Sequence, residues 1–494
     1  MSNSVTQSPL DIQNALQPAR DALLAARTPA AFRQAELLAH RLAREAADLV
    51  VEEALRQVMA DPQFREDAVE SVRRTQEFRH GGHRDVEVTL LGGRKVSFWV
   101  DYFKPDHRGR RGRKRTKRGK SGVGLYPQLA ALGFAAGVSP ALAVEICTQV
   151  ADSDSVRSGS AALARRGMDL GHKQTLRIVN SFSARAVAQR DRWLDQARRT
   201  TPRAGPLSGQ RVVVATDGGR LRERLVDPRG RRRDLTGHHR YDAPWREPKL
   251  LTIYVISELG QVIRSFKPVY DGTLEDADAI FEMILGYLLA LGGHLAKELI
   301  VLGDGALWIW ERIPSLIQKL GLNPAQVTQV IDWCHAAQTL HEISDARLTW
   351  EPGAKEAWLH RTKQALHNGD TCTILEHIDA LGRGRNAKAV LEHRKYFERN
   401  AARMQYSAFE EANLPTGSGA IESAVRRVIN MRLKSNGMFW IERNAQGMLL
   451  FRSYLKAGHL DHLFDWSMSQ SVPWWRPLGT SQPSLPLDLH PAEQ

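Results

Sequence analysis

Three acidic residues occupy positions from which they could form one site for phosphodiester chemistry. Asp217 follows the apolar run 211–216 and Asp304 follows the run 298–303, each in an Asp-Gly pair. Glu422 lies at the start of a long amphipathic segment. Carboxylates gathered in this way hold two divalent cations roughly 3.5 to 4 Å apart, which activate a water or 3′-hydroxyl and stabilise the leaving oxygen.

Magnesium suits such a set of ligands because it binds oxygen, keeps several waters and takes few protein carboxylates. We therefore expect two Mg²⁺ ions per site, with Mn²⁺ as a substitute, bound by Asp217, Asp304 and Glu422. Taken singly, an Asp-Gly pair after a strand is usually a turn. Two such pairs and a glutamate at a helix start, in this order, favour a joint catalytic role.

The elements that must position these residues have the order β-β-β-α-β-α-β. Short buried-strand patterns and helical patterns alternate, which predicts an α/β fold with a central mixed sheet covered by helices. This is the order of a ribonuclease-H-like fold. The expected strands are 211–216, 250–256, 261–266, 298–303 and 327–332, and the expected helices are 274–291, 308–320 and, closing the fold, 420–455.

The rest of the chain divides around this catalytic core. Helical DNA-binding regions are expected to precede it, and an all-helical insertion to interrupt it. The expected segments are an N-terminal helical region (1–80), a β-hairpin and basic linker (81–122), a helix-turn-helix-like DNA-binding region (123–200), the first part of the catalytic domain (208–335), the helical insertion (336–414), the closing helix (415–460) and a mobile Pro-rich tail (461–494).

The net charge of +14 favours a polyanionic partner, most simply double-stranded DNA. Anionic lipid is the competing polyanion, but the low-charge stretch 125–150 is better explained by two short helices joined at a Gly-Val-Ser-Pro turn than by a membrane span. The run 108–120 contacts DNA phosphates or is a solvated linker, and the net charge favours phosphate contact. The basic residues expected to bind DNA are Arg110, Arg111, Arg113, Lys114, Arg115, Lys117, Arg118, Arg220, Arg222, Arg426, Arg427 and Lys434.

Cysteine usage and the N-terminus indicate a cytoplasmic protein. The three cysteines, Cys147, Cys334 and Cys372, are far apart in the sequence and predict neither a disulfide framework nor a Cys-x-x-Cys zinc ribbon. The first residues contain no basic stretch followed by an apolar one, so no secretory signal is expected.

Four motifs together resemble those of bacterial DDE transposases, most closely the ISKra-like group of insertion sequences. They are Asp-Gly-Gly-Arg-Leu-Arg-Glu-Arg (217–224), Trp-Arg-Glu-Pro-Lys-Leu (245–250), Gly-Asp-Gly-Ala-Leu-Trp-Ile-Trp (303–310) and Gly-Ser-Gly-Ala-Ile-Glu-Ser-Ala-Val-Arg-Arg-Val (417–428). The resemblance covers about residues 85–460. It implies a ribonuclease-H-like domain in which Asp217, Asp304 and Glu422 are the metal-binding triad, with a helical insertion before the glutamate. It also implies a bacterial protein that is associated with the nucleoid.

Similar transposases also carry a Cys/Asp-x-x-His signature after the fifth strand. Here it matches Asp332 and His335, or Cys334 and His335 alone. His335 then contacts the scissile phosphate, or it caps the following helix, and both interpretations stay open. Some relatives have a cysteine-rich zinc segment near the N-terminus, which this chain lacks, so recognition of DNA ends is expected to use helices and basic loops.

The resulting hypothesis is a DDE-type transposase that binds the terminal inverted repeats of an insertion sequence and catalyses 3′-end hydrolysis and strand transfer. A homodimer or larger assembly is expected on DNA, because two ends must be brought together; the state of the free protein is left open. The alternatives are a catalytically inactive, transposase-derived DNA-binding protein and a ribonuclease-H-like nuclease without strand transfer.

Overall fold

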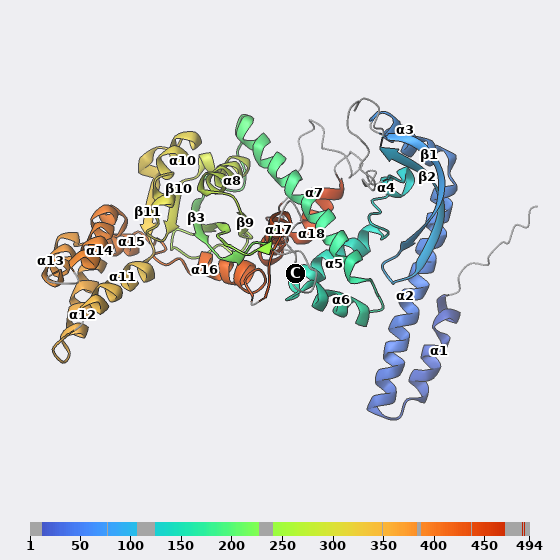
Figure 1. Ribbon diagram of the computed structural model, residues 1–494, viewed down its shortest axis with the longest axis horizontal. Coiled ribbons are helices and arrows are strands. Elements are labelled where there is room, and N and C mark those ends of the chain that lie inside the picture. Colours follow the sequence, from blue (N-terminus) through green and yellow to red (C-terminus); the bar gives the residue numbers. More distant parts are fainter. Residues whose placement is uncertain are drawn as a thin grey trace, which may run out of the picture. The chain divides into compact units, whose positions relative to one another are not determined.

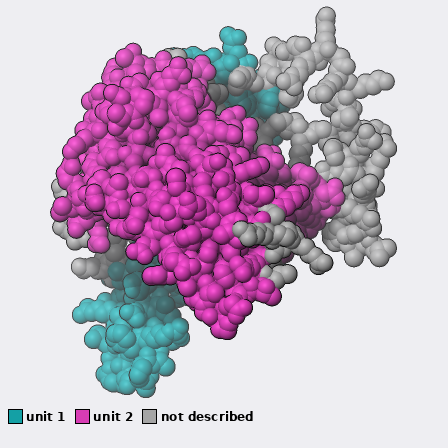
Figure 2. All heavy atoms as spheres, turned by 90° about the vertical axis from the view of Figure 1, so that its left-hand side faces the viewer, with its two compact units in different colours: residues 1–182, 464–484 teal, residues 183–463, 485–494 magenta. Residues whose placement is uncertain are grey.

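The chain folds into two compact units. The computed structural model describes residues 12–76, 78–105, 124–226, 241–347, 349–382, 387–435 and 437–469, with Leu487 and Leu489. Unit 1 comprises residues 1–182 and 464–484, and unit 2 comprises residues 183–463 and 485–494 (Figure 2). The seven finer segments expected from the sequence are not tested by this division and stay predictions.

Unit 1 begins with three helices, which confirms the helical pattern of the N-terminal region. They are α1 (Ile12–Ala25), α2 (Pro29–Ala60) and α3 (Pro62–Arg73), and α1 packs along α2 (Figure 1). Helix α2 starts where Thr28 Oγ1 accepts the backbone N–H of Ala31 at 3.2 Å and Pro29 occupies the first helical position. Both features are favourable helix-start signals.

A long β-hairpin follows, as predicted from the alternating pattern. Strands β1 (Phe78–Thr89) and β2 (Lys95–Pro105) pair antiparallel. Their inward side chains, among them Val88, Val96 and Phe98, form a buried cluster with residues of α2 and α4. The buried Asp48 of α2 fixes the turn of the hairpin, because its two carboxylate oxygens accept the backbone N–H groups of Gly92 and Arg94, each at 2.9 Å.

Short helices complete unit 1. They are α4 (Pro127–Ala131), α5 (Pro140–Asp152), α6 (Val156–Arg165), the start of α7 (His172–Arg199) and the end of α18 (Leu460–Ser469). Ser155 caps α6 by accepting the N–H of Ser158 at 3.0 Å. The pair α5 and α6 lies where a helix-turn-helix-like unit is expected, and its role in DNA binding stays a prediction. No described helix is long and apolar enough to cross a membrane.

Unit 2 is a mixed α/β structure built on a five-stranded sheet. The strands are β3 (Arg211–Gly218), β8 (Lys249–Ile256), β9 (Val269–Thr273), β10 (Glu298–Gly303) and β11 (Val327–Ile331). Their spatial order is β11-β10-β3-β8-β9. The pairs of β10 with β3 and β11 are parallel, whereas β8 is antiparallel to both β3 and β9.

Helices cover this sheet, since successive residues of β3 and β8 are buried whichever face they point to. The helices of this layer and the connections are α8 (Ala277–Ala290), η1 (Gly293–Leu295), α9 (Leu307–Trp310), α10 (Ile313–Leu320), η2 (Pro324–Gln326), α16 (Gly419–Val425) and α17 (Glu442–Ala457). Two small ribbons pair β4 (Leu221–Arg222) with β7 (Trp245–Arg246) and β5 (Leu225–Val226) with β6 (Tyr241–Asp242).

A helical block separates β11 from α16, as the sequence predicts for residues 336–414. It comprises α11 (Trp333–Ala346), α12 (Ala354–His367), α13 (Thr371–Leu381), α14 (Ala387–Asn400), η4 (Ala401–Arg403) and α15 (Tyr406–Glu411) (Figure 1). No strand occurs among the residues described between 336 and 414. At the other end of the chain, the tail expected at 461–494 begins within α18, and most of its remainder lies outside the described residues.

The prediction of a strand at 261–266 is wrong. The third strand is β9, and Val262 forms only an isolated bridge with Ile256. Val262 is 57% exposed, whereas every residue of β9 is buried. The sequence of β9 contains an Asp-Gly pair, which indicates a turn rather than a buried strand. In β9 the aspartate of this pair, Asp271, is instead buried with an ionic partner, which is described below.

The continuous closing helix expected at 420–455 is also wrong. Helix α16 runs into a π-helix, η5 (Arg426–Asn430), and the chain then leaves helical geometry until α17. Between them, the N–H of Trp440 donates to the carbonyl of Arg222 at 2.9 Å, and the N–H of Arg224 donates to the carbonyl of Trp440 at 2.6 Å. Because the backbone N–H and carbonyl of Trp440 are hydrogen-bonded to the β4 ribbon, they cannot form the hydrogen bonds of a helix.

The ionic partner of β9 is Arg190 of α7. Both Arg190 and Asp271 are buried and hydrogen-bonded to each other, and Tyr287 Oη donates to Asp271 Oδ2 at 2.5 Å. Tyr454 Oη lies 2.9 Å from Tyr287 Oη, which extends the network to α17. Within unit 2, this network joins the C-terminal part of α7 to β9, α8 and α17.

Asp271→Asn is predicted to destabilise the protein by about 3–5 kcal/mol, because it leaves the charge of Arg190 buried without its counter-charge. Asp191→Asn is the matched control: Asp191 also contacts Arg190, at 2.7 Å, but is 55% exposed and should cost no more than about 1 kcal/mol. Urea unfolding followed by circular dichroism measures both. Equal losses in the two variants would contradict a dominant role for the buried pair.

Candidate active site

The ends of two neighbouring parallel strands bring Asp217 and Asp304 together. The register of β3 and β10 pairs Ala215 with Leu302, so continuing it by two residues places Asp217 beside Asp304. Both side chains are half-buried. The structure therefore provides the juxtaposition of the two aspartates that the sequence pattern predicts.

Local backbone contacts orient the two carboxylates. Asp217 Oδ1 accepts the N–H of Gly218 at 2.6 Å, and Asp304 Oδ1 accepts the N–H of Ala306 at 2.9 Å. Trp310 Nε1 donates to the carbonyl of Asp304 at 2.8 Å, which holds the loop against α9. In the described part of the chain, no donor is bonded to Oδ2 of either aspartate.

The glycine after Asp304 permits close packing of the helical block. A Cβ atom at Gly305 would lie 1.8 Å from Cε2 of Tyr396 in α14. Any side chain there would force the ring of Tyr396 or the loop of Asp304 to move. Packing against the helical block therefore requires the glycine of this Asp-Gly pair.

Glu422 reaches the site from the first turn of α16, where it is exposed. Ser418 Oγ donates to Glu422 Oε1 at 2.9 Å, and His335 Nδ1 lies 3.9 Å from the same oxygen. The loop before α16 thus orients the glutamate, while the start of α11 places an imidazole beside it.

Asp332 holds these two segments in place. It is the N-cap of α11, and its Oδ1 accepts both the backbone N–H of His335 at 2.7 Å and a bond from His335 Nδ1 at 3.1 Å. Its Oδ2 accepts the N–H of Ser418. The interpretation of His335 as the cap of this helix is therefore wrong, because Asp332 supplies the cap and the ring of His335 points to Asp332 and Glu422.

Burial, hydrogen bonds and neighbouring charges shift the pKa values of three side chains of the site. Burial, together with the nearby charges of Asp304 and Glu422, raises the pKa of Asp217 to about 6. The hydrogen bond to Asp332, with the neighbouring carboxylates, raises the pKa of His335 to about 9. Although burial acts in the opposite direction, bonds from His335 and Ser418 hold the pKa of Asp332 well below its usual range.

The donor set fits hard divalent cations such as Mg²⁺. Asp217 and Asp304 each present an oxygen that carries no hydrogen bond from the described residues, and Glu422 adds a third, exposed carboxylate. Among the described residues, however, the ligand atoms of this site that all lie within 4.8 Å of one another are those of Asp332, His335 and Glu422, and not those of Asp217, Asp304 and Glu422. Because both oxygens of Asp332 already accept hydrogen bonds, we assign it to positioning and not to metal binding.

Some of the expected DNA-binding residues lie at the surface of the described part of the chain. Arg220, Arg426 and Lys434 are exposed. Arg222 is also exposed and lies over the rings of Trp245 and Phe439.

Arg427 differs, because Nη2 donates to Tyr270 Oη at 3.1 Å and the side chain is half-buried. The remaining expected contacts, Arg110, Arg111, Arg113, Lys114, Arg115, Lys117 and Arg118, lie outside the described residues.

Sequence reasoning missed the positioning roles of Asp332, Ser418 and Trp310. A signal for Asp332 exists: it follows the last buried strand directly and stands three residues before His335, as an N-cap residue does. Ser418 stands four residues before Glu422, a spacing that brings two side chains together on a helix. Nothing in the sequence distinguishes the indole of Trp310 from an ordinary core tryptophan.

Comparison of the chain with protein-family models, with curated proteins and with solved structures found no significant match.

Replacing Asp332 with asparagine is predicted to lower the pKa of His335 from about 9 by roughly one unit or more, because an opposite charge at hydrogen-bond distance is worth about 1–3 units. NMR titration of His335 in metal-free protein measures the change. Asp345→Asn, at an exposed aspartate near the other end of α11, should leave this pKa unchanged. An unaltered pKa in the Asp332 variant would refute the assigned contact.

Proposed function

We propose that the protein is a DDE-type DNA transposase, which hydrolyses a phosphodiester bond at the ends of a mobile element and joins the freed 3′ end to target DNA. The observation that carries the proposal is that the charges of two carboxylates from separate elements, Asp304 and Glu422, act on a third, Asp217. Asp217 and Asp304 come from the ends of adjacent parallel strands, and Glu422 comes from the start of a helix. His335 lies beside Glu422 and is also within the electrostatic influence of Asp304.

The topology supports a ribonuclease-H-like fold for unit 2. In chain order the five strands are first to fifth, and their spatial order is third, second, first, fourth, fifth. The first three are antiparallel neighbours, and the fourth and fifth continue parallel to the first. Such a sheet brings the ends of the first and fourth strands to one edge, which is where Asp217 and Asp304 lie.

The residues of the site divide the work of phosphodiester chemistry among them. Bound Mg²⁺ supplies activation of the attacking oxygen and stabilisation of the leaving oxygen. Asp217, Asp304 and Glu422 hold the ions through carboxylate oxygens. His335 engages Asp332 through Nδ1, which leaves Nε2 to donate to a phosphate oxygen of the scissile strand.

The basic surface supports a DNA substrate. Arg220 and Arg222 follow Asp217 within five residues, and Arg426 and Lys434 follow Glu422. Exposed cations beside the acidic centre hold a nucleic-acid backbone that the carboxylates alone would repel. Because strand transfer joins two element ends to one target, we propose that a dimer or larger assembly acts on DNA.

Asp217→Asn, Asp304→Asn and Glu422→Gln are each predicted to abolish DNA breaks at the element ends. The substrate is a supercoiled plasmid carrying this gene with its native flanking DNA, incubated with Mg²⁺, Mn²⁺ or EDTA, and the breaks and joints are mapped by sequencing. Wild-type breaks should require the metal. Joints to target DNA distinguish a transposase from a nuclease that only hydrolyses.

The matched controls are Asp278→Asn and Glu411→Gln, which alter exposed carboxylates on α8 and α15 and should retain activity. Cleavage that survives in the triad variants would overturn the assignment of the site. Binding of DNA by wild type without cleavage under any metal would favour a DNA-binding protein derived from a transposase.

Arg426→Ala is predicted to weaken DNA binding at every sequence and to reduce the slope of log affinity against log salt by about 0.9, the value for one phosphate contact. Fluorescence anisotropy over a salt series measures the slope. Arg41→Ala, at an exposed position on α2, is the control and should leave it unchanged. A loss confined to one DNA sequence would indicate a base contact instead.

A further inference from the structure

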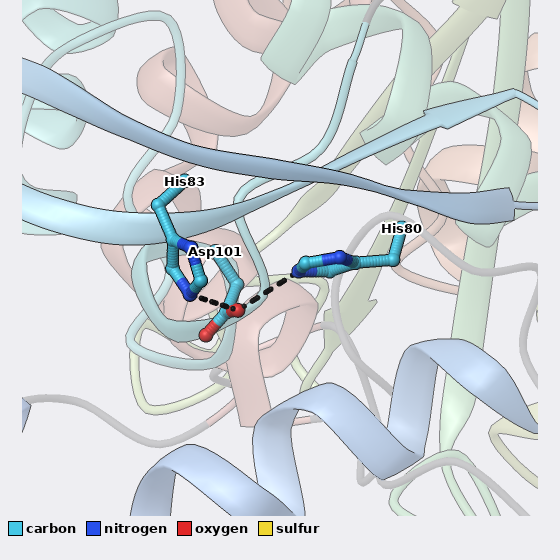
Figure 3. Close-up of side chains that lie close together, drawn as sticks. All are labelled: His80, His83 and Asp101. Atoms are coloured by element: carbon cyan, nitrogen blue, oxygen red, sulfur yellow. Dashed lines mark hydrogen bonds and ion pairs between the residues drawn. The ribbon is translucent and has the colours of Figure 1, made fainter.

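A second cluster of metal-ligating side chains lies in unit 1, on the β-hairpin. His80 and His83 of β1 and Asp101 of β2 point toward one another (Figure 3). Residues three apart on a regular strand point to opposite faces. The register shifts between His80 and His83, and Gly82 has a φ of +89°. This bulge turns both imidazoles to the face that carries Asp101.

The ligand atoms converge on one oxygen. Nε2 of His80 lies 3.1 Å and Nε2 of His83 lies 3.0 Å from Asp101 Oδ1. Neighbouring ligand atoms around a tetrahedral zinc ion, at bond lengths of about 2.0–2.2 Å, are about 3.3 Å apart. The two distances to Asp101 are therefore close to those of a zinc site, and all three ligand atoms lie within 4.8 Å of one another. The two histidines are partly exposed, which leaves the site accessible from solvent.

The other oxygen of Asp101 is held by the surrounding residues. Arg65 Nε donates to Oδ2 at 2.8 Å, and Gln128 Nε2 donates to it at 2.7 Å. The carboxylate itself is 5% exposed. These bonds orient Asp101. Hydrogen bonds from outer residues that fix a ligand in this way are typical of metal sites.

Hydrogen bonding alone does not satisfy His83. Arg65 Nη2, a donor, lies 2.7 Å from His83 Nε2, and the same nitrogen is 3.0 Å from Asp101 Oδ1. If Nε2 is protonated, it donates to Asp101 and faces the N–H of Arg65. If it is unprotonated, it accepts from Arg65 and has no proton to share with the carboxylate oxygen beside it. A cation between Nε2 and Oδ1 resolves this conflict, but it takes the place of Arg65 Nη2, which also donates to Asp101 Oδ1 at 3.3 Å. Because the guanidinium is planar and rigid, Arg65, whose side chain is 51% exposed, leaves Asp101 as a whole when the ion binds, and Gln128 keeps its bond to Oδ2.

We propose that His80, His83 and Asp101 bind a divalent transition-metal ion, of which zinc fits best. Two imidazoles and one carboxylate suit zinc and its neighbours in the first transition row, whereas Mg²⁺ prefers an all-oxygen shell. The ion joins β1 to β2 at the bulge and stiffens the end of the hairpin that leads into residues 106–123. This site is separate in sequence and chemistry from the acidic centre of unit 2.

Zinc titration of the metal-free full-length protein, by calorimetry and by metal analysis after dialysis, tests the proposal. Wild type and the double variant Asp217→Asn/Asp304→Asn should both bind one zinc ion at this site. His80→Gln and His83→Gln should each weaken that binding by about 100-fold or more, beyond the 10–100-fold typical of lost outer contacts. The exposed His40→Gln, on α2, is the matched control and should bind as wild type does.

Cobalt provides a second readout that does not depend on DNA cleavage. Co²⁺ in a tetrahedral site with nitrogen ligands absorbs visible light, and this band should appear in wild type and disappear in the two histidine variants. Far-UV circular dichroism confirms that each variant is folded. Absence of zinc binding in wild type, or equal binding in the histidine variants, would overturn the proposal and leave the cluster as a hydrogen-bond network around Asp101.

Discussion

The candidate active site depends on the carboxylate of Asp332, which holds two of its segments together. Asp332 ends the sheet, starts α11 and accepts the N–H of Ser418, which lies 86 residues further along the chain. The backbone adds a second tie, because the N–H of Trp333 donates to the carbonyl of Thr416 at 2.9 Å. These bonds fix the helix that carries Glu422 to the sheet whose strands end at Asp217 and Asp304. An ionised carboxylate is essential here, since all its partners are donors.

The parts of the fold that the sequence predicts are those governed by local pattern. The runs around Val213, Ile253 and Ile300 are short, apolar and bounded by turn residues, so the strands they form follow directly from periodicity. The Asp-Gly pairs at the ends of β3 and β10 indicated the two aspartates of the site for the same reason. Their meeting also required the strand order, which is encoded only indirectly, through the succession of elements along the chain.

The parts that could not be predicted depend on distant partners. Strand β9 contains Asp271, whose burial is stabilised by Arg190 from a helix about eighty residues earlier. The break after Asn430 arises because Trp440 pairs with the β4 ribbon, while the amphipathic pattern continues through it. The bulge that brings His80 and His83 to one face corresponds in the sequence to two glycines between them, and these glycines by themselves predict only a turn.

The segments that lead into and out of the helical block lie side by side, and this has an entropic consequence. Its two ends are hydrogen-bonded to each other at Asp332 and Ser418. The block is therefore a closed loop attached to the sheet, whatever the number of residues in it. The cost of closing a loop grows only with the logarithm of its length, by about 0.6 kcal/mol for each doubling. Insertions and deletions between α12 and α14 are therefore expected to destabilise the candidate active site little, and its carboxylates can keep their positions when the length of the block changes.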